Sequence, residues 1–329
     1  MKRGIVALAI CVALPIALPF VITNEFYVNM ASQILIYALL ALSLNILLGY
    51  GGMTSLGHAA YLGITAYACV IVAGAGYGQL STAIIAVAVS TLAAALFGVL
   101  ALRASGLGFL MITLALGQIV WGIAYRANDL TGGDNGIRFP ARPMPFGIDI
   151  SSAPRFYYFT LIVFALALFC IWRFTRSPFG ASLEGTRDQP RRMRMLGHNV
   201  WMIRWFAFVM AGFWGSIAGL LYIYYNLFIS PHAISLQQSA EVLLMAILGG
   251  ASTLTGPIVG AIIITLVKNV VSTYVDRWNS LLGAIFVIVV VFMPHGLVPG
   301  FRQLWMRFRQ ANAPKTAAKP APGTLGPPP

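Results

Sequence analysis

The sequence predicts an all-α protein that crosses a membrane about ten times, and three observations carry this prediction. Only 9% of its 329 residues are charged, against about a quarter in soluble domains. Hydrophobic residues make up 59%, more than one globular core of this length can hide from water, so the excess must face lipid. Apolar runs recur along the chain at the length of about 20 residues that crosses a bilayer as a helix. An ordinary soluble enzyme is therefore excluded.

The apolar runs divide around one long basic loop. Six runs precede it, at residues 5–22, 29–48, 57–74, 80–102, 108–125 and 156–173. Three follow it, at 205–227, 233–272 and 280–298. The run 233–272 is interrupted by glycines and is long enough for two crossings, the first of them Ala233 to Gly250. This division predicts ten crossings, with nine crossings and a re-entrant segment as the alternative.

The first run also allows a second interpretation. Lys2 and Arg3 precede it, as the basic residues of a cleaved signal peptide do. The run is longer than a usual signal core, and no small-residue cleavage site follows before Asn24. A retained first helix is therefore expected.

Basic residues predict the orientation. The formal charge is +13, but the bases gather in a few segments, which is typical of the positive-inside rule and not of nucleic-acid binding. With the N-terminus inside, fifteen of the 21 Lys and Arg residues fall in cytoplasmic segments. In the outer loop 126–155, four arginines are offset by three aspartates. Both termini are thus predicted to be cytoplasmic, which requires an even number of crossings.

The chain is predicted to have one domain. Residues 1–310 form a transmembrane domain that includes the cytoplasmic loop 176–204. Residues 311–329 are rich in Pro, Ala and Lys, a composition that cannot bury a core, and are expected to be a disordered cytoplasmic tail.

Motifs for enzyme chemistry are missing from the sequence. It contains no GxxxxGK[ST] loop, HExxH or GxSxG motif, and its four histidines lie far apart. We therefore expect no catalytic residue, no metal site and no cofactor bound by this chain. If energy is consumed, another chain must supply it.

Two glycine-broken segments match each other in opposite halves of the chain. Residues 51–57 and 249–256 both read as two glycines, small hydroxyl residues, Leu and Gly, with one insertion. Interrupted apolar segments in corresponding positions predict an internal repeat whose broken helices lie along a substrate path; a chance match of short segments is the alternative. The expected helix-break and gating residues are Gly51, Gly52, Gly57, Gly249, Gly250 and Gly256.

Polar residues inside apolar runs are costly and need a partner, a cavity or a packing explanation. The candidates for a translocation path are Asn45, Ser55, His58, Gln118 and Glu241. For His58 a structural hydrogen bond is favoured over a role in the path. Glu241 is equally consistent with a position near the outer interface, and Lys268 with a side chain that reaches the membrane surface.

The loop that begins at Arg176 has the features of a docking element. Ser177 followed by Pro178 favours a helix start, and Pro190 should divide the segment into two short helices. Leu183, Met193, Met195 and Leu196 place apolar groups among charges. Such a helix lies on a surface or inserts into a partner's groove; a solvated loop that only sets topology is the alternative.

In this loop and in several other blocks, the chain resembles the inner-membrane permeases of branched-chain amino acid ABC importers, of the LivM type. The resemblance covers nearly the whole chain. Its blocks are Ser55–Gly63, Thr131–Gly133, Ser177–Gly180 with Arg187-Asp188 and Leu196-Gly197, Ala207-Phe208, Ala218-Gly219, Leu248–Gly250, Gly256-Pro257 with Gly260-Ala261, and Pro294 with Gly296-Leu297.

The resemblance implies a type II-like importer permease with broken helices in the bacterial inner membrane. The implied partners are a second homologous permease, two cytoplasmic ABC ATPases that hold ATP and Mg²⁺, a periplasmic substrate-binding protein and membrane lipid, but no nucleic acid. Transport would proceed by alternating access. The implied coupling residues are Ser177, Pro178, Phe179, Gly180, Arg187, Asp188, Leu196 and Gly197.

The resemblance leaves the substrate open among branched-chain or related amino acids, urea or amides, and small organic acids. An ion-coupled secondary transporter is a rival that only Glu241 favours. A membrane scaffold or intramembrane enzyme is a second rival, against which the missing catalytic groups count.

Overall fold

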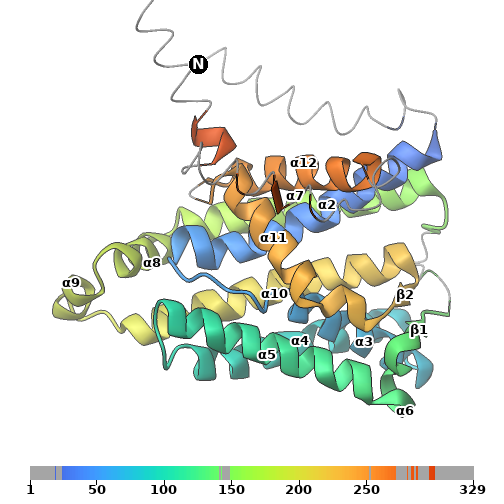
Figure 1. Ribbon diagram of the computed structural model, residues 1–329, viewed down its shortest axis with the longest axis horizontal. Helices are drawn as coiled ribbons and strands as arrows, with labels where there is room; N and C mark the ends of the chain where they lie inside the picture. The colour runs from blue at the N-terminus through green and yellow to red at the C-terminus, as the bar shows by residue number, and fades with distance from the viewer. Residues whose placement is uncertain are drawn as a thin grey trace, which may run out of the picture.

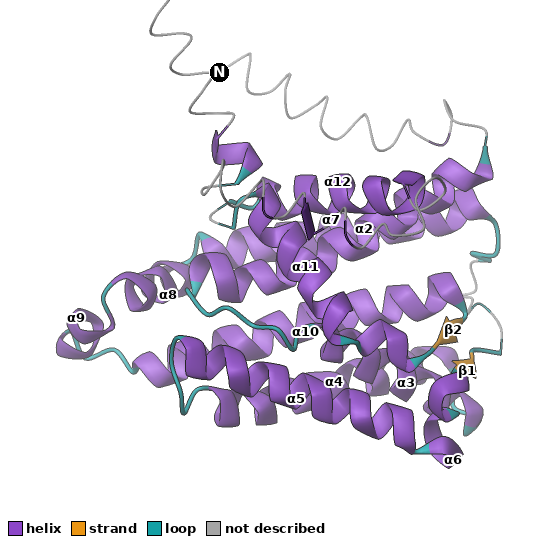
Figure 2. Cartoon of the chain, viewed as in Figure 1, coloured by secondary structure: helices purple, strands orange, loops and turns teal. Residues whose placement is uncertain are grey.

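The computed structural model describes residues 24–140, 149–251, 253–271 and 296–300, with Pro19, Arg142 and four isolated positions between 280 and 287. Almost all of this part is helix, which confirms the all-α prediction for it (Figure 2). One two-stranded antiparallel ribbon pairs Ile137 with Ile229 and Arg138 with Phe228. The predicted first run 5–22, most of 280–298 and the tail 311–329 lie outside the described residues.

The first half of the bundle contains four long helices. Its elements are α2 (Glu25–Asn45), the π-helical turn η1 (Ile46–Tyr50), α3 (Ala59–Gly74), α4 (Gln79–Ala101) and α5 (Leu107–Arg126). Short elements follow, namely α6 (Asn128–Thr131), the 3-10 turn η2 (Gly133–Asn135) and β1 (Ile137–Arg138).

The second half begins with a long helix and a helical projection. Its elements are α7 (Ala153–Thr175), α8 (Pro178–Asp188), α9 (Pro190–Met195), α10 (Val200–Asn226), β2 (Phe228–Ile229), the 3-10 turn η4 (Pro231–Ile234), α11 (Leu236–Gly249) and α12 (Thr255–Val271). In Figure 1, α8 and α9 project from one end of the bundle, and the β1–β2 ribbon lies at the other.

Within the described residues, five helices are long and apolar enough to cross a membrane: α2 with η1, α4, α5, α7 and α10. Three shorter apolar helices, α3, α11 and α12, occupy the predicted runs 57–74 and 233–272. The polytopic prediction is thereby supported, while ten crossings remain a prediction.

The predicted short span from Ala233 to Gly250 is divided between two elements, and its role as a crossing stays a prediction. It consists of part of η4 followed by α11, which has 14 residues and is about 21 Å long at 1.5 Å per residue. A hydrocarbon core of about 30 Å exceeds that length. The cause is local, because Ser235 leaves helical geometry and caps α11 by accepting a hydrogen bond from Gln238 N.

Helix α10 begins within the predicted cytoplasmic loop 176–204. Asn199 caps α10 by accepting a hydrogen bond from Met202 N at 3.1 Å, so residues 200–204 already belong to the helix. Pro190 divides the loop as predicted, because α8 ends at Asp188 and α9 begins at Pro190.

Helices α2 and α10 form the centre of the bundle. In the apolar window of α2, 72% of residues are buried, and 61% in that of α10, against 22–28% in α4, α5 and α7. Helix α2 packs against α7, α10, α11 and α12, while α10 packs against α3 and α4. The peripheral helices therefore present most of their apolar surface outward, where the expected solvent is lipid.

Candidate functional site

The Ser-Pro-Phe-Gly segment joins α8 to the bundle, and each residue has a physical role. Ser177 is the N-cap of α8, and its Oγ accepts a hydrogen bond from Gly180 N at 3.3 Å. Pro178 occupies the first helical turn, where a missing N–H costs nothing. A Cβ at Gly180 would collide with the carbonyl of Thr175, so glycine allows α8 to turn back against the end of α7.

Phe179 anchors the same segment through aromatic contacts. Its ring centroid lies 5.3 Å from that of Phe174 in α7 and 5.0 Å from that of Phe206 in α10. Leu183, one turn further along α8, is fully buried. Helix α8 is therefore packed on both α7 and α10 and is positioned to move with them.

Arg187 connects α8 to the end of α2. Its Nη1 donates a hydrogen bond to the carbonyl of Gly49 at 2.6 Å, and its Nε is paired with Asp188 at 2.8 Å. Gly52, with a φ of +65°, faces the aliphatic part of the Arg187 side chain. Because L residues rarely adopt this φ, glycine at position 52 suits both the backbone and the contact.

Helix α9 leaves apolar groups uncovered at the tip of the projection. Met195 is 87% exposed and Leu196 73%. Gly197 follows with a φ of +83° and turns the chain toward α10. Exposed apolar side chains beside Arg191, Arg192 and Arg194 are typical of a surface that another protein covers.

The first glycine-broken segment leaves helical geometry after η1 and returns to it at α3. Glycine 57 lies against α5, where a Cβ would collide with the carbonyl of Thr113. The N–H of Leu56 donates a hydrogen bond to Thr113 Oγ1 at 3.3 Å, and that of Ala59 donates to Ser239 Oγ at 3.3 Å. The interrupted segment thus lies between α5 and α11.

The second glycine-broken segment lies against the end of α2 and against η1, directly before the first segment. Asn45 Nδ2 donates a hydrogen bond to the carbonyl of Thr253 at 2.9 Å. A Cβ at Gly49 would collide with the carbonyl of Ala251. The second segment is therefore in contact with the end of α2 and with η1, which leads into the first segment, and the role of both segments in gating remains a prediction.

Glycines also bring other backbones together at this place. A Cβ at Gly249 would collide with the carbonyl of Gly256, and Gly296 lies against the backbone of Gly250. Gly250 has a φ of +115°. At Gly249 and Gly256 the backbones of α11 and α12 are consequently in contact without an intervening side chain.

The five path candidates do not gather at one point. Asn45 joins α2 to the second interrupted segment. Ser55 is buried, and its Oγ accepts a weak hydrogen bond from Gly57 N at 3.4 Å. Gln118 belongs to a cavity at the other end of the bundle.

His58 is fully buried and hydrogen-bonded, as the structural interpretation predicts. Its Nε2 lies 2.7 Å from the Ser43 hydroxyl. Within the described residues its Nδ1 has no hydrogen-bond partner. The ring also packs edge-on against Tyr61, with centroids 5.3 Å apart.

Glu241 has a partner that the sequence analysis did not assign. Lys268 Nζ lies 2.8 Å from Glu241 Oε2, and the Glu241 side chain is only 3% exposed. Gln237 Nε2 donates to the other carboxylate oxygen at 3.3 Å. The expectation that Lys268 extends to the membrane surface is therefore wrong, because the buried carboxylate attracts its ammonium group.

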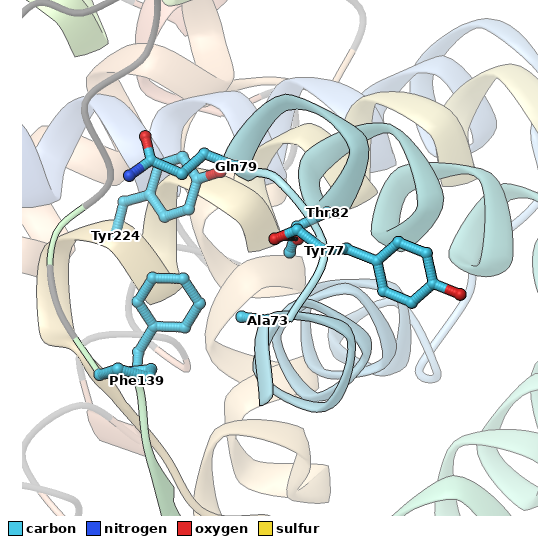
Figure 3. Close-up of a pocket in the computed structure, with 7 residues that line it drawn as sticks. Ala73, Tyr77, Gln79, Thr82, Phe139 and Tyr224 are labelled. Atoms are coloured by element: carbon cyan, nitrogen blue, oxygen red, sulfur yellow. Dashed lines mark hydrogen bonds between the residues drawn. The ribbon is translucent and has the colours of Figure 1, made fainter. Parts of the chain in front are cut away.

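The cavities differ in chemistry. One of about 200 Å³ lies at the end of α3 and α4 near the β1–β2 ribbon and has no charged side chain in its wall. Figure 3 shows Phe139, Tyr224 and Gln79 at one side of it, with the Tyr77 ring turned away.

An apolar groove of about 700 Å³ runs between α4 and α10, past Ile84, Leu92 and Phe213. Its lining suits lipid chains.

A third cavity, of about 460 Å³, lies at the β1–β2 end of the bundle. It combines polar and aromatic groups from α5, η2, η4 and α11, among them Gln118, Trp121, Tyr125, Asp134, His232 and Gln237. Its volume falls in the range of roughly 300–1,000 Å³ that is usual for small-molecule sites.

Residues 26–293 match the family described as the branched-chain amino acid transport system permease component. The chain belongs to this family. It is a family of transport permeases and not of enzymes, and its members are multi-pass inner-membrane proteins that work within a membrane-embedded complex.

Individual relatives agree with this assignment. The chain is 28% identical to the high-affinity branched-chain amino acid transport system permease protein LivM of Salmonella typhimurium, over 94% of this chain and 79% of that protein. It is likewise 28% identical to LivM of Escherichia coli, over 91% of this chain and 75% of that protein. A shorter match, 29% identical over 45% of this chain and 46% of the relative, is to the autoinducer 2 import system permease protein LsrC of Salmonella typhi. No solved structure matches the chain.

Proposed function

We propose that this chain is the permease subunit of an ATP-binding cassette importer that carries branched-chain or related amino acids across the inner membrane. The similarity to LivM over more than nine tenths of the chain supports this substrate class. ATP hydrolysis takes place in two partner ATPases. A second, homologous permease completes the transmembrane pathway, and a periplasmic binding protein delivers the substrate.

The proposed topology has ten crossings with both termini in the cytoplasm. The eight apolar helices α2, α3, α4, α5, α7, α10, α11 and α12 supply eight of them. The predicted runs 5–22 and 280–298 supply the others. This topology places the bases of α8 and α9 in the cytoplasm and the β1–β2 ribbon outside, as the positive-inside rule requires.

The proposed coupling element is the segment 176–204, which contacts the ATPases through the exposed Met195 and Leu196. One observation carries this proposal: the hydrogen bond from Arg187 to the carbonyl of Gly49. It connects the projecting helix α8 to the end of α2, and Asn45 connects α2 to the second interrupted segment. Movement of α8 by the ATPases is thereby carried to both interrupted segments.

The interrupted segments are the proposed gate. Backbone contacts at Gly49, Gly57, Gly249 and Gly256 pack without side chains between them, and packed elements of this kind change between discrete arrangements in preference to deforming continuously. Alternating access then follows from two arrangements of the same contacts, of which ATP binding selects one.

The experiment that tests the proposal is a mild-detergent pull-down of this chain from its native membrane. The co-purifying proteins are identified, and vanadate-sensitive ATPase activity is measured in the eluate. A second permease with ATPase subunits supports the proposal. A single chain that transports substrate in liposomes without an ATPase would instead establish the ion-coupled secondary transporter.

A second candidate concerns the substrate only. The partial match to LsrC, whose description names autoinducer 2 import, shows that this permease type is used for more than one solute. Uptake of urea, amides, small organic acids or autoinducer 2, with no uptake of leucine, isoleucine or valine by the purified complex, would favour that candidate.

A further inference from the structure

The wall of the cavity between α5 and α11 combines two kinds of chemistry. Asp134 of η2 lines it together with the stacked rings of Trp121 and Tyr125, whose centroids are 5.2 Å apart at an interplanar angle of 16°. A carboxylate beside aromatic faces attracts an ammonium group through charge and through the ring quadrupole. Within the described residues, Asp134 forms no ion pair, so its charge is available to a ligand.

The same wall also carries hydrogen-bond donors. Gln118 contributes a side-chain amide that has no hydrogen-bond partner in the described part of the chain. The N-terminus of α11 lies in the same wall, where Ser235 caps the helix and Leu236 and Gln237 form its first turn. N–H groups at a helix start and an amide donor favour a carboxylate.

We propose that this cavity binds the α-ammonium and α-carboxylate groups of a free amino acid before it moves inward. Asp134 with the Trp121–Tyr125 pair takes the ammonium group, and Gln118 with the start of α11 takes the carboxylate. This inference rests on the proposed function, because it assumes that amino acids reach this end of the bundle.

Gln237 connects the cavity to the interior of the bundle. It lies in the cavity wall, and its amide donates to Glu241 one turn deeper in α11. Glu241 in turn is paired with Lys268. A substrate that displaces Gln237 from this contact thus acts on the ion pair between α11 and α12.

The test measures binding of three probes to the purified importer complex without its binding protein. The probes are leucine, 3-methylbutylamine, which lacks the carboxylate, and 4-methylpentanoate, which lacks the amine. Saturation-transfer NMR in detergent gives their relative affinities. Leucine is expected to bind more tightly than either analogue.

Two variants separate recognition from a general structural effect. Asp134→Asn should weaken binding of leucine and of the amine about two- to fivefold, in keeping with an exposed charge, and leave binding of the acid unchanged. Gln118→Leu should weaken leucine and the acid and leave the amine unchanged. Asp129→Asn is the matched control, since Asp129 is an exposed carboxylate in neighbouring α6 outside the cavity wall; it should change none of the three.

Three outcomes would overturn the proposal. Leucine does not bind the complex, both variants weaken all probes equally, or Asp134→Asn weakens attachment of the binding protein and not of leucine, which would make the cavity a protein docking site. Failure of the proposed function is a different result. In that case the wild-type complex with its binding protein takes up none of the branched-chain amino acids into liposomes.

Discussion

The Arg187 guanidinium donates a hydrogen bond to the carbonyl of Gly49, 138 positions earlier in the chain, with an Nη1–O distance of 2.6 Å. The bond joins the end of α8 to the turn that ends the central helix α2. Asn45, one helical turn before Gly49, bonds to the carbonyl of Thr253 in the second interrupted segment. Three segments that are distant in sequence therefore meet within a few residues of α2.

Replacement of Arg187 and Asp188 by alanine should uncouple ATP hydrolysis from transport. A hydrogen bond to a charged group contributes roughly 1.5–3 kcal/mol. Because the Arg187 side chain is 34% exposed, we expect the lower end of that range, or about a tenfold loss of substrate-stimulated ATPase activity. Membrane insertion should be retained. Arg103→Ala, an exposed base in the turn after α4, is the control, and full stimulation in the double variant would contradict the coupling role.

Asn45→Ala should destabilise the contact between α2 and the second interrupted segment. The carbonyl of Thr253 would lose its donor in a partly buried position, at a cost of about 1–3 kcal/mol. The measurement is the thermal unfolding midpoint of the detergent-purified chain, together with the rate of uptake by the complex. Asn226→Ala removes an exposed amide whose hydrogen bond to Tyr222 is local, and it should shift the midpoint little. Equal shifts of the midpoint in both variants would show that the Asn45 hydrogen bond makes no specific contribution to stability.

Gly49→Ala should lower the yield of folded protein or abolish transport. The new Cβ would meet the backbone carbonyl of Ala251, and backbone cannot move aside as a flexible side chain does. Gly74→Ala is the matched control, because a Cβ there meets nothing within 4 Å. Size-exclusion profiles of the two detergent-solubilised variants give the comparison. A Gly49→Ala protein with a normal profile and normal uptake would disprove the close packing of Gly49 against Ala251.

Single substitutions of the Glu241–Lys268 pair should each cost more than the double substitution. Glu241→Gln leaves the ammonium group without a counter-charge, and Lys268→Met leaves a carboxylate that is 3% exposed. Removal of one partner of a buried pair costs up to roughly 3–5 kcal/mol, while replacement of both is often nearly neutral. Unfolding midpoints of the four proteins in this double-mutant cycle test the coupling. Additive shifts would mean that the two charges do not interact.

Several local features of the coupling segment could be predicted from the sequence because they depend on residues that are neighbours in the chain. Ser177 and Pro178 begin α8, and Pro190 separates α8 from α9. Caps and proline act within one helical turn, so short windows of sequence contain the information. The position of Phe179 between α7 and α10 could not be predicted. Its partner Phe206 lies on a different helix, and only the packing of the helices brings the rings together.

The path candidates also show that contacts between residues distant in the chain could not be predicted from the sequence. Composition identified Glu241 and Lys268 as costly groups in apolar runs, but not as partners, because they lie 27 positions apart on two helices. The start of α10 after Asn199 was not predicted, although Asn is a preferred N-cap residue and could have indicated it. Gly49 lies two residues before the glycine pair of the first segment, so the repeated pattern does not include it.

By itself the sequence determined that lipid surrounds much of the protein and that the protein is helical. It also determined the family and the two places where helices break. These properties follow from composition and from local patterns, since lipid requires long apolar helices and glycine permits their interruption. Tertiary structure alone decided that the second break touches the end of α2, that Arg187 contacts Gly52 in the first break, and that Lys268 pairs with Glu241. The physical reason is that these contacts join separate helices, and the crossing geometry of packed helices determines which side chains meet.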